Sequence, residues 1–586
     1  MSVELSGASV EARTLDNGIP LRAAGGRLRG YLRFADRQAA VAVAIHIVSL
    51  AFAGVVVMWL NRRQWFFGDE WEFVANRLRG AGRALLAPHN EHWSTGPILI
   101  YRGLYAVFGL RSYLPYVAVL VTFHLLATHL LWRLLRRADV APLIASALAA
   151  VFSVLGAGSE NLLWAFQIGF VASVALGLLH ILLVDHDGPF DRRDRAAWGV
   201  GMAALTFSGI SVTMLAMSGL VVLIRRGVKS ALYAVAPPAA VYAVWFVWVG
   251  HEGLKHQDRG VDLVLAIPTY VWTGLSSALE RSSGLPGAGS TLVILLVVGL
   301  LVHHAGRAAA APTAMAVGAV LLFAVLSIGR SAQGIDQATS GRYVYIAIAL
   351  LLPSVGILLS HPAVRPAPRQ AVVLVIVGFV LLNGLGALRL DSRNQGDREV
   401  QMRHRILAAA DLVSSRREVV ATLPEPMYSP DLTVTVLERL LRDKALPVGL
   451  HIPEPDVLAA AGDLQVALVP APPSNVGGPV AGRPVITGVG VVVDRDGCAA
   501  LTTTAGMPAH AEVRIAAPTA MPVRSVAGGE LEVALRSADD PNVVGPSRTF
   551  ALAPGETSWL HVARIGPMSL TMPPGSRLCG VQAAPG

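Results

Sequence analysis

Long apolar runs recur along the first two thirds of the chain, and they constrain its fold more than any other feature. Crossing a bilayer takes about 20 largely apolar residues. One apolar stretch, 196–224, is too long for one span and is broken by Ser208-Gly209-Ile210-Ser211, which predicts two short helices meeting at a turn. Together these stretches predict a polytopic α-helical membrane protein with about eleven transmembrane helices. The single runs lie at 39–60, 113–132, 141–157, 165–184, 231–249, 289–305, 308–328, 343–360 and 371–390.

The composition agrees with a chain that lies among membrane lipids. Hydrophobic residues make up 53% of it and charged residues only 15%, whereas a soluble domain carries roughly 25% charged residues. The net charge of +9 does not indicate a nucleic-acid partner, because the basic residues sit in short clusters between the apolar runs. Arg greatly outnumbers Lys, and Ala and Gly are abundant, which is typical of a GC-rich bacterial genome.

Short basic loops predict the orientation. Clusters such as Arg133 to Arg137, Arg192 to Arg195 and Arg225 to Lys229, with Arg307, Arg365 and Arg369, fall on one side, which the positive-inside rule assigns to the cytoplasm. An odd number of spans then places the C-terminal residues outside. The first outer loop, residues 61–112, also holds several arginines, but long loops are weakly governed by charge.

The domain boundaries follow from these assignments. Residues 1–38 are polar and predict a disordered cytoplasmic tail, not a signal peptide. Residues 39–390 form the transmembrane domain, and 391–470 predict an extracytoplasmic α/β segment with a helix at 398–413, a strand at 418–422 and a helix at 431–443. A Pro/Gly-rich linker, 470–484, leads to short alternating runs over 485–586 that predict an extracytoplasmic β-sandwich.

The only two cysteines, Cys498 and Cys579, both fall in the part assigned outside. A pair in an oxidising compartment predicts a disulfide, which would tie an early strand to the last one. Two unrelated buried thiols are the alternative.

The first outer loop has the densest set of polar and aromatic groups. Asp69 and Glu70 follow Trp65-Phe66-Phe67-Gly68, and acidic groups at a bilayer surface are costly to desolvate and usually functional. Either carboxylate could take a proton from a hydroxyl. Further along, His89, Glu91 and Trp93 lie in one short polar run, and His89 with His92 has a spacing that could also hold a metal. Simple solvation of a loop is the alternative for all of them.

Two further clusters lie at span ends. Glu160, Asn161, Trp164 and Gln167 fall about one helical turn apart and are expected to share a face suited to sugar hydroxyls, with helix capping by Ser159 and an interfacial Trp anchor as the alternative. Arg330 and Arg342, followed by Tyr343, frame a late outer loop. Because a guanidinium group binds oxygens in pairs, they suit a lipid-linked phosphate, with snorkelling to headgroups as the alternative.

In this order of motifs the chain resembles the GT-C superfamily of polyprenyl-phosphate-sugar-dependent glycosyltransferases. Phe67-Gly68-Asp69-Glu70 looks like the acidic motif of the first extracytoplasmic loop, and Ser340-Gly341-Arg342-Tyr343 looks like the Arg-Tyr motif before a late span. The resemblance covers residues 1–390. The tail is similar in placement to the extracytoplasmic domains of actinobacterial arabinofuranosyl- and mannosyltransferases.

The resemblance implies inverting transfer of a sugar from a polyprenyl phosphate to a glycan, lipid or protein acceptor outside the bacterial cytoplasmic membrane. Asp69 would be the general base, Glu70 would position the acceptor or share that role, and Arg342 with Arg330 would hold the leaving phosphate. The other polar residues would line the sugar or acceptor pocket. Some members need a divalent metal and others do not; the chain has no clear ligand set, so no cofactor is assigned and a divalent metal stays open.

Two other functions are compatible with parts of the sequence. A transporter or flippase of a lipid-linked glycan would predict polar residues or broken helices at mid-membrane, whereas the spans are apolar apart from a few histidines. A non-catalytic wall-binding protein would leave the polar density of the first outer loop without a role. The sugar, the acceptor, the ligand of the tail and the oligomeric state do not follow from the sequence.

Overall fold

The computed structural model describes residues 21–80, 82–253, 261–302, 309–361, 367–473, 483–501 and 509–584. The first 20 residues, Arg307, Arg365 and most of the predicted linker therefore lie outside the described residues.

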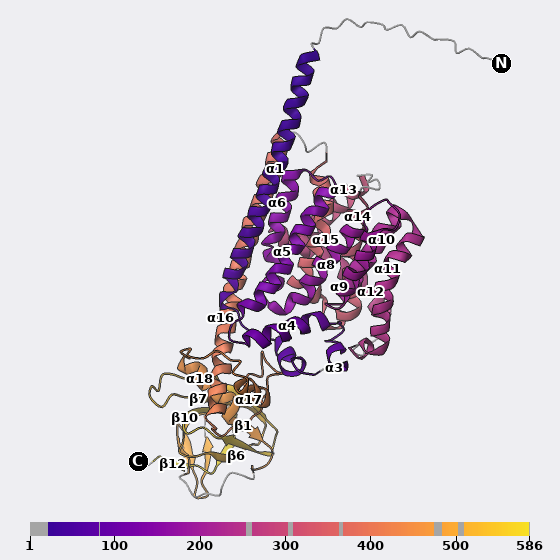
Figure 1. Cartoon of the computed structure of the whole chain (residues 1–586). Coiled ribbons are helices and arrows are strands. Elements are labelled where there is room, and N and C mark those ends of the chain that lie inside the picture. The colour runs from indigo at the N-terminus through magenta and orange to yellow at the C-terminus, as the bar shows by residue number, and fades with distance from the viewer. Residues whose placement is uncertain are drawn as a thin grey trace, which may run out of the picture.

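The first two thirds of the described chain form a bundle of helices (Figure 1). Each apolar stretch of the sequence contains a helix, and Ser208 and Gly209 lie in the predicted turn between α9 and α10. Among the described residues, seven helices are long and apolar enough to cross a membrane, and two shorter apolar helices accompany them. The bundle helices are α1 (Leu21–Leu60), α5 (Leu114–Arg137), α6 (Pro142–Ser153), α8 (Ile168–Val184), α9 (Arg192–Leu205), α10 (Ile210–Arg226), α11 (Val228–Trp248), α12 (Val261–Ser283), α13 (Gly289–Val302), α14 (Ala310–Arg330), α15 (Gly341–Leu359) and α16 (Ala367–Ser414).

Three helical segments differ from the sequence prediction. Residues 21–38, predicted as disordered, are the first turns of α1, because Leu, Ala and Arg are good helix formers that extend the following apolar helix. Helix α12 was not predicted, since Asp262, Pro268 and Glu280 interrupt its apolar pattern. The predicted span 371–390 and helix 398–413 are one continuous helix of 48 residues, α16, whose one proline, Pro368, lies in the first turn, where it does not break a helix.

The two ends of the bundle differ in what they carry. Helices α1 and α16 lie side by side, and both point from the end near the N-terminus towards the end that bears the C-terminal region (Figure 1). The basic loops gather at the end of the bundle opposite to the C-terminal region. There Arg137 pairs with Asp185 at 3.0 Å, and Arg226 pairs with Asp194 at 2.6 Å. The first outer loop lies at the same end as the C-terminal region and contains α2 (Glu70–Glu72), α3 (Arg83–Leu86) and α4 (Thr95–Phe108).

The C-terminal region contains two helices and two six-stranded sheets, with strand orders β1-β9-β6-β11-β4-β3 and β12-β2-β5-β10-β7-β8. Strand β5 alternates buried and exposed residues along its length, so one face of its sheet packs on the core and the other faces outward. The helices are α17 (Val434–Arg442) and α18 (Glu454–Gln465). The strands are β1 (Val466–Val469), β2 (Val485–Thr487), β3 (Val491–Val493), β4 (Cys498–Leu501), β5 (Ala509–Ile515), β6 (Thr519–Ser525), β7 (Gly529–Leu535), β8 (Arg548–Leu552), β9 (Thr557–Val562), β10 (Gly566–Met572), β11 (Ser576–Cys579) and β12 (Gln582–Ala583).

The predicted disulfide between Cys498 and Cys579 is confirmed, and it joins the neighbouring strands β4 and β11. One detail of the prediction is wrong. The described residues 418–422 run as a loop without strand pairing, where Val420 donates its backbone N–H to the Leu464 carbonyl. The last residues of the predicted segment 391–470 form β1, which pairs with β9 and so joins one of the sheets.

Several contacts fix the C-terminal region against the first outer loop. Arg79 pairs with Asp443 at 2.9 Å, and Arg439 donates hydrogen bonds to the Val74 and Ala75 carbonyls. Arg111 binds the Lys444 carbonyl, with Nη2 at 2.8 Å. The loop is thus held from both sides, by the bundle and by the C-terminal region.

Candidate active site

Asp69 lies in a tight turn that the C-terminal region helps to hold. Gly68 before it has a φ of +61°, a conformation that L side chains rarely adopt. A Cβ at Gly68 would also lie 3.4 Å from the Trp164 ring. The Gly68 N–H donates to the Tyr428 carbonyl at 2.9 Å. The glycine therefore serves both the turn and its close packing, and the carboxylate of Asp69 keeps a side-chain exposure of 49%.

Glu70 is fully buried beneath the same turn. Its carboxyl group accepts hydrogen bonds from the Phe67 N–H at 3.0 Å, the Trp164 Nε1–H at 3.2 Å, and the hydroxyls of Tyr101 and Tyr113. Burial raises its pKa to about 8 although these donors act in the opposite direction. Glu70 is thus enclosed by protein groups and holds the loop, whereas its neighbour Asp69 faces solvent.

A chain of charged groups supports Asp69 from the first outer loop. His89 Nε2 lies 4.0 Å from an Asp69 oxygen, its Nδ1 lies 3.1 Å from Glu72, and Glu72 pairs with Arg77 at 2.8 Å. Burial opposes the charge on His89, but Asp69 and Glu72 outweigh burial and raise its pKa to about 9. The His89 imidazolium in turn lowers the pKa of Asp69, which is ionised at neutral pH.

Arg330 and Arg342 reach the same place from the late outer loop. Arg330 Nη2 binds Glu91 at 2.6 Å, and Glu91 lies 3.9 Å from His92. Glu160 Oε2 accepts a hydrogen bond from the backbone N–H of Arg342 at 2.7 Å. The positive charges of both arginines also lower the pKa of Asp69, so both lie close enough to stabilise its carboxylate.

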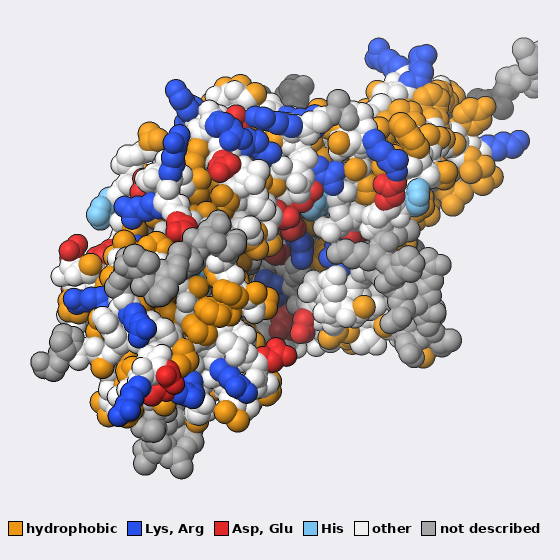
Figure 2. Space-filling model, turned by 90° about the horizontal axis from the view of Figure 1, so that it is seen from below, with side chains coloured by type: hydrophobic (Ala, Val, Ile, Leu, Met, Phe, Trp, Pro, Cys, Tyr) orange, Lys and Arg blue, Asp and Glu red, His pale blue; other side chains and the backbone are white. Residues whose placement is uncertain are grey.

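One cavity brings these groups together. Asp69, His89, Arg330 and Arg342 all line it, although 273 positions separate Asp69 from Arg342 along the chain. Seen from the end that bears the C-terminal region, the surface is hollowed near its centre, and acidic and basic side chains gather around the hollow (Figure 2). The rest of the lining is mostly aromatic or polar: Phe73, Asn90, His92, Ser94, Pro97, Phe166, Gln167, Gly169, Phe170, Phe207 and Ser208.

The predicted shared face of Glu160, Asn161, Trp164 and Gln167 is wrong. Helix α7 (Glu160–Leu163) ends where Trp164 adopts an extended backbone, and a 3-10 turn, Ala165–Gln167, follows. Trp164 is held there by its hydrogen bond to Glu70, which explains the break. Gln167 consequently lines the cavity of Asp69, whereas Glu160 and Trp164 line a second one.

Three other residues predicted from the sequence to bind substrate mainly pack against neighbouring residues or support Arg342. Trp93 stacks on Trp245 with ring centroids 4.9 Å apart and is buried. Asn161 is buried and donates to the Arg342 carbonyl at 3.2 Å. Tyr343 is buried below Arg342, whose guanidinium carbon lies 5.4 Å from the Tyr343 ring centroid. These residues support the position of Arg342 or the packing around the loop.

The structure brings a metal-type cluster together at the opposite end of the bundle. Among the described residues, the one group of three with ligand atoms within 4.8 Å of one another is His186, Asp191 and Asp194. Asp194 already pairs with Arg226, a cation. The spacing of His89 and His92, which could hold a metal, lies in the candidate site instead. There His89 Nδ1 faces Glu72, and the backbones of the two histidines form hydrogen bonds with each other.

Sequence reasoning missed the groups that hold the charged residues in place. Tyr101 and Tyr113 bind Glu70, and Glu72 orients His89, yet only Glu72 had a signal, its position three residues after Asp69. Arg398 and Tyr428, from the other end of the sequence, line the second cavity and carried no signal.

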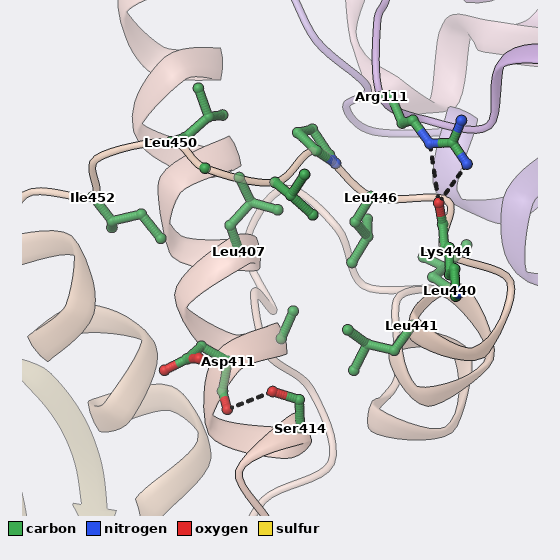
Figure 3. Close-up of a pocket in the computed structure, with 14 residues that line it drawn as sticks. Arg111, Leu407, Asp411, Ser414, Leu440, Leu441, Lys444, Leu446, Leu450 and Ile452 are labelled. Atoms are coloured by element: carbon green, nitrogen blue, oxygen red, sulfur yellow. Dashed lines mark hydrogen bonds between the residues drawn. The ribbon is translucent and has the colours of Figure 1, made fainter.

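A larger cavity of about 520 Å³ lies away from these groups, between α16 and α17 (Figure 3). Leu407, Leu441, Leu446 and Leu450 give it a largely apolar lining, and Arg111 lies at its edge. Its lining also holds Asp411 and Lys444, but Arg111 is bound to the Lys444 carbonyl and none of the acidic and basic residues predicted from the sequence lines it, so the smaller cavity of Asp69 is the candidate active site.

Comparisons with known proteins give weak likenesses. No protein-family profile and no curated protein matches the chain. The chain is similar to ArnT from Cupriavidus metallidurans bound to undecaprenyl phosphate, with 14% identity over 72% of this chain and 92% of that chain and a TM-score of 0.43. The apo state of the same protein gives 14% identity over 73% and 93%, with a TM-score of 0.42. An oligosaccharyltransferase from Archaeoglobus fulgidus, tethered with an acceptor peptide, gives 12% identity over 62% and 57%, with a TM-score of 0.34. Likeness at this level does not assign a function.

Proposed function

We propose that this chain is a membrane glycosyltransferase that moves a sugar from a polyprenyl phosphate to a hydroxyl of a cell-envelope acceptor. The observation that carries the proposal is the cavity lined jointly by Asp69, Arg330 and Arg342. An ionised carboxylate opposite two guanidinium groups suits a reaction in which a hydroxyl loses a proton while a phosphate leaves.

In this reaction the acceptor oxygen attacks the anomeric carbon of the donor sugar. The bond between that carbon and the phosphate oxygen breaks, and the polyprenyl phosphate leaves with the electron pair, so a direct displacement inverts the anomeric centre. Asp69 accepts the hydroxyl proton, and Arg342 with Arg330 neutralises the leaving phosphate. The His89 imidazolium lowers the pKa of Asp69, which makes it a weaker base, and lies 4.0 Å from its carboxylate, where it can orient it.

Glu70 has a positioning role in this proposal rather than a catalytic one. It is fully buried, and four donors from the protein surround its carboxyl group. Those contacts connect the turn of Asp69 to Tyr101, Tyr113 and Trp164. His89 and Gln167, which line the cavity, would contact the donor sugar.

We place the site on the extracytoplasmic side of a bacterial cytoplasmic membrane, with the C-terminal region outside. The support is the gathering of basic loops at the opposite end of the bundle, as at Arg137 and Arg226. Such loops favour the cytoplasm. The confirmed disulfide is compatible with an oxidising compartment on the side of the C-terminal region.

The test is Asp69→Asn in purified protein reconstituted with a radiolabelled polyprenyl-phosphate sugar and envelope acceptor. We expect transfer to fall by at least about a hundredfold, the usual contribution of general base catalysis. Asp336→Asn is the matched control, since Asp336 is an exposed acid in the late outer loop that does not line the cavity. Transfer by Asp69→Asn at the wild-type rate would contradict the proposal.

A further inference from the structure

A second cavity of about 190 Å³ lies beside the candidate active site. The bundle supplies Phe67, Glu160 and Trp164 to its lining. Gln395 and Arg398 come from the part of α16 that extends towards the C-terminal region, and Tyr428 comes from the loop that follows this helix. The cavity therefore exists only because the bundle and the C-terminal part of the chain meet there.

Covalent and hydrogen-bonded connections tie this cavity to the reacting groups. Phe67 lies two residues before Asp69, and Gly68 between them binds the Tyr428 carbonyl. Glu160 lines the second cavity while its Oε2 accepts the N–H of Arg342. A ligand in the second cavity would thus lie on the other side of the turn that carries Asp69.

The lining combines flat apolar faces with polar groups of several kinds. The Phe67 and Trp164 rings lie 5.0 Å apart between centroids and are tilted by 48°. Around them stand the carboxyl groups of Glu160 and Glu399, the Gln395 amide and the Arg398 guanidinium group. Glu160 and Gln395 already have hydrogen-bond partners in the protein, but a polyprenyl chain would still bring these charged and polar groups into apolar contact, which is costly. A sugar ring offers C–H faces for the aromatic rings and hydroxyls for the polar groups.

We propose that this second cavity is the acceptor subsite, that it binds the terminal sugar of a glycan, and that α16 and Tyr428 complete it. This inference rests on the proposed function, because it names the acceptor class of the same site. It gives the C-terminal region a part in acceptor recognition beside the catalytic turn.

A labelling experiment tests the subsite without any need for turnover. The chain's two cysteines form a disulfide, so a single introduced cysteine is the only free thiol. Arg398→Cys places it at the second cavity, and Arg393→Cys is the matched control, an exposed arginine on the same helix that does not line the cavity. The full-length variants are treated with a maleimide, with and without oligosaccharides released from the envelope of the source cells.

We expect the oligosaccharides to slow the labelling of Arg398→Cys at least fivefold and to leave Arg393→Cys unchanged. Equal labelling rates with and without oligosaccharide at Arg398→Cys would overturn the subsite. Slowing of both variants alike would overturn it as well, because the effect would then not belong to the cavity.

Kinetics of Tyr428→Ala provide the second measurement. The substitution removes the ring but keeps the carbonyl that holds Gly68, so the turn of Asp69 retains this contact. We expect KM for envelope acceptor to rise about tenfold, with KM for the polyprenyl-phosphate sugar unchanged. A fall in kcat with both KM values unchanged would mean a structural role only and would overturn the inference. The two proposals can fail separately. If Asp69→Asn loses transfer but Tyr428→Ala keeps the wild-type acceptor KM, the subsite alone is contradicted. If Asp69→Asn transfers at the wild-type rate, the proposed catalysis is contradicted, even if oligosaccharides protect Arg398→Cys.

Discussion

Glu160 binds Arg342 through the backbone N–H of the arginine and not through its guanidinium group, at 2.7 Å. The same Glu160 oxygen accepts the Ser340 hydroxyl at 2.9 Å, so one carboxylate fixes the chain on both sides of Gly341. A Cβ at Gly341 would lie 3.3 Å from that oxygen, which explains a glycine between the two contacts. The guanidinium group is left to line the cavity of Asp69.

Loss of the Glu160 charge is therefore expected to weaken phosphate binding through Arg342. A hydrogen bond to a charged group contributes about 1.5–3 kcal/mol, so Glu160→Gln should raise Kd for a polyprenyl phosphate by about tenfold or more. Titration calorimetry of the purified variant with a short-chain polyprenyl phosphate measures the change. Asp336→Asn, the same change of charge at an exposed site in this loop, should keep the wild-type Kd. An unchanged Kd in Glu160→Gln would mean that Arg342 does not depend on this contact.

Glu70 should make stability depend on pH in an unusual direction. Its pKa rises from 4.5 to about 8 on folding, so the fold favours the protonated carboxyl group. Its contribution to stability is present below pH 4.5 and is lost as the pH rises through about 8. Glu70→Gln is neutral at every pH, so the wild-type melting temperature should fall relative to the variant between pH 6 and pH 9. Thermal unfolding of both proteins in detergent measures this difference, and a difference independent of pH would show that Glu70 is ionised throughout.

The fold could be predicted from the sequence where a single pattern dominates. Continuous apolar runs gave the bundle helices, and alternation gave β5 and β7 of the C-terminal sheets. Helix α12 was missed because charged residues and Pro268 break its apolar pattern. The continuity of α16 was missed because its composition turns from apolar to charged near Arg389. Such a change resembles a domain boundary, but the helix continues through it.

The candidate site could be predicted only in its charged groups. Asp69, Arg330 and Arg342 stand out because they lie at the ends of apolar runs, where charges are rare. The groups that hold them, such as Tyr101 and Tyr428, are ordinary residues in the sequence, and tertiary contacts alone give them a role. The break at Trp164 likewise comes from a hydrogen bond to Glu70, 94 residues away, which no local pattern reports.

His89 should set the alkaline limit of the reaction. Its pKa rises from 6.5 to about 9, so the imidazolium next to Asp69 persists at neutral pH and is lost as the pH rises through about 9. Loss of the imidazolium removes the ion pair that orients the Asp69 carboxylate, so we expect kcat/KM of the wild type to decline above that pH. His89→Asn removes the charge, so its kcat/KM should be about tenfold lower at pH 7, a change of about 1.4 kcal/mol, and its alkaline decline should disappear. Initial rates from pH 6 to pH 10 give both profiles, and an alkaline decline that persists in the variant would assign the limit to another group.

Cys498 and Cys579 allow a direct test of the membrane orientation. The two residues form a disulfide in the C-terminal region and are the only cysteines in the chain. If this region lies outside, a membrane-impermeant maleimide added to intact cells should label both residues after mild reduction and neither of them before it. The paired change Cys498→Ser and Cys579→Ser is the control and should abolish labelling. Labelling that appears only in inverted vesicles would place the C-terminal region, and with it the cavity of Asp69, on the cytoplasmic side, where the first outer loop could not meet an extracytoplasmic acceptor.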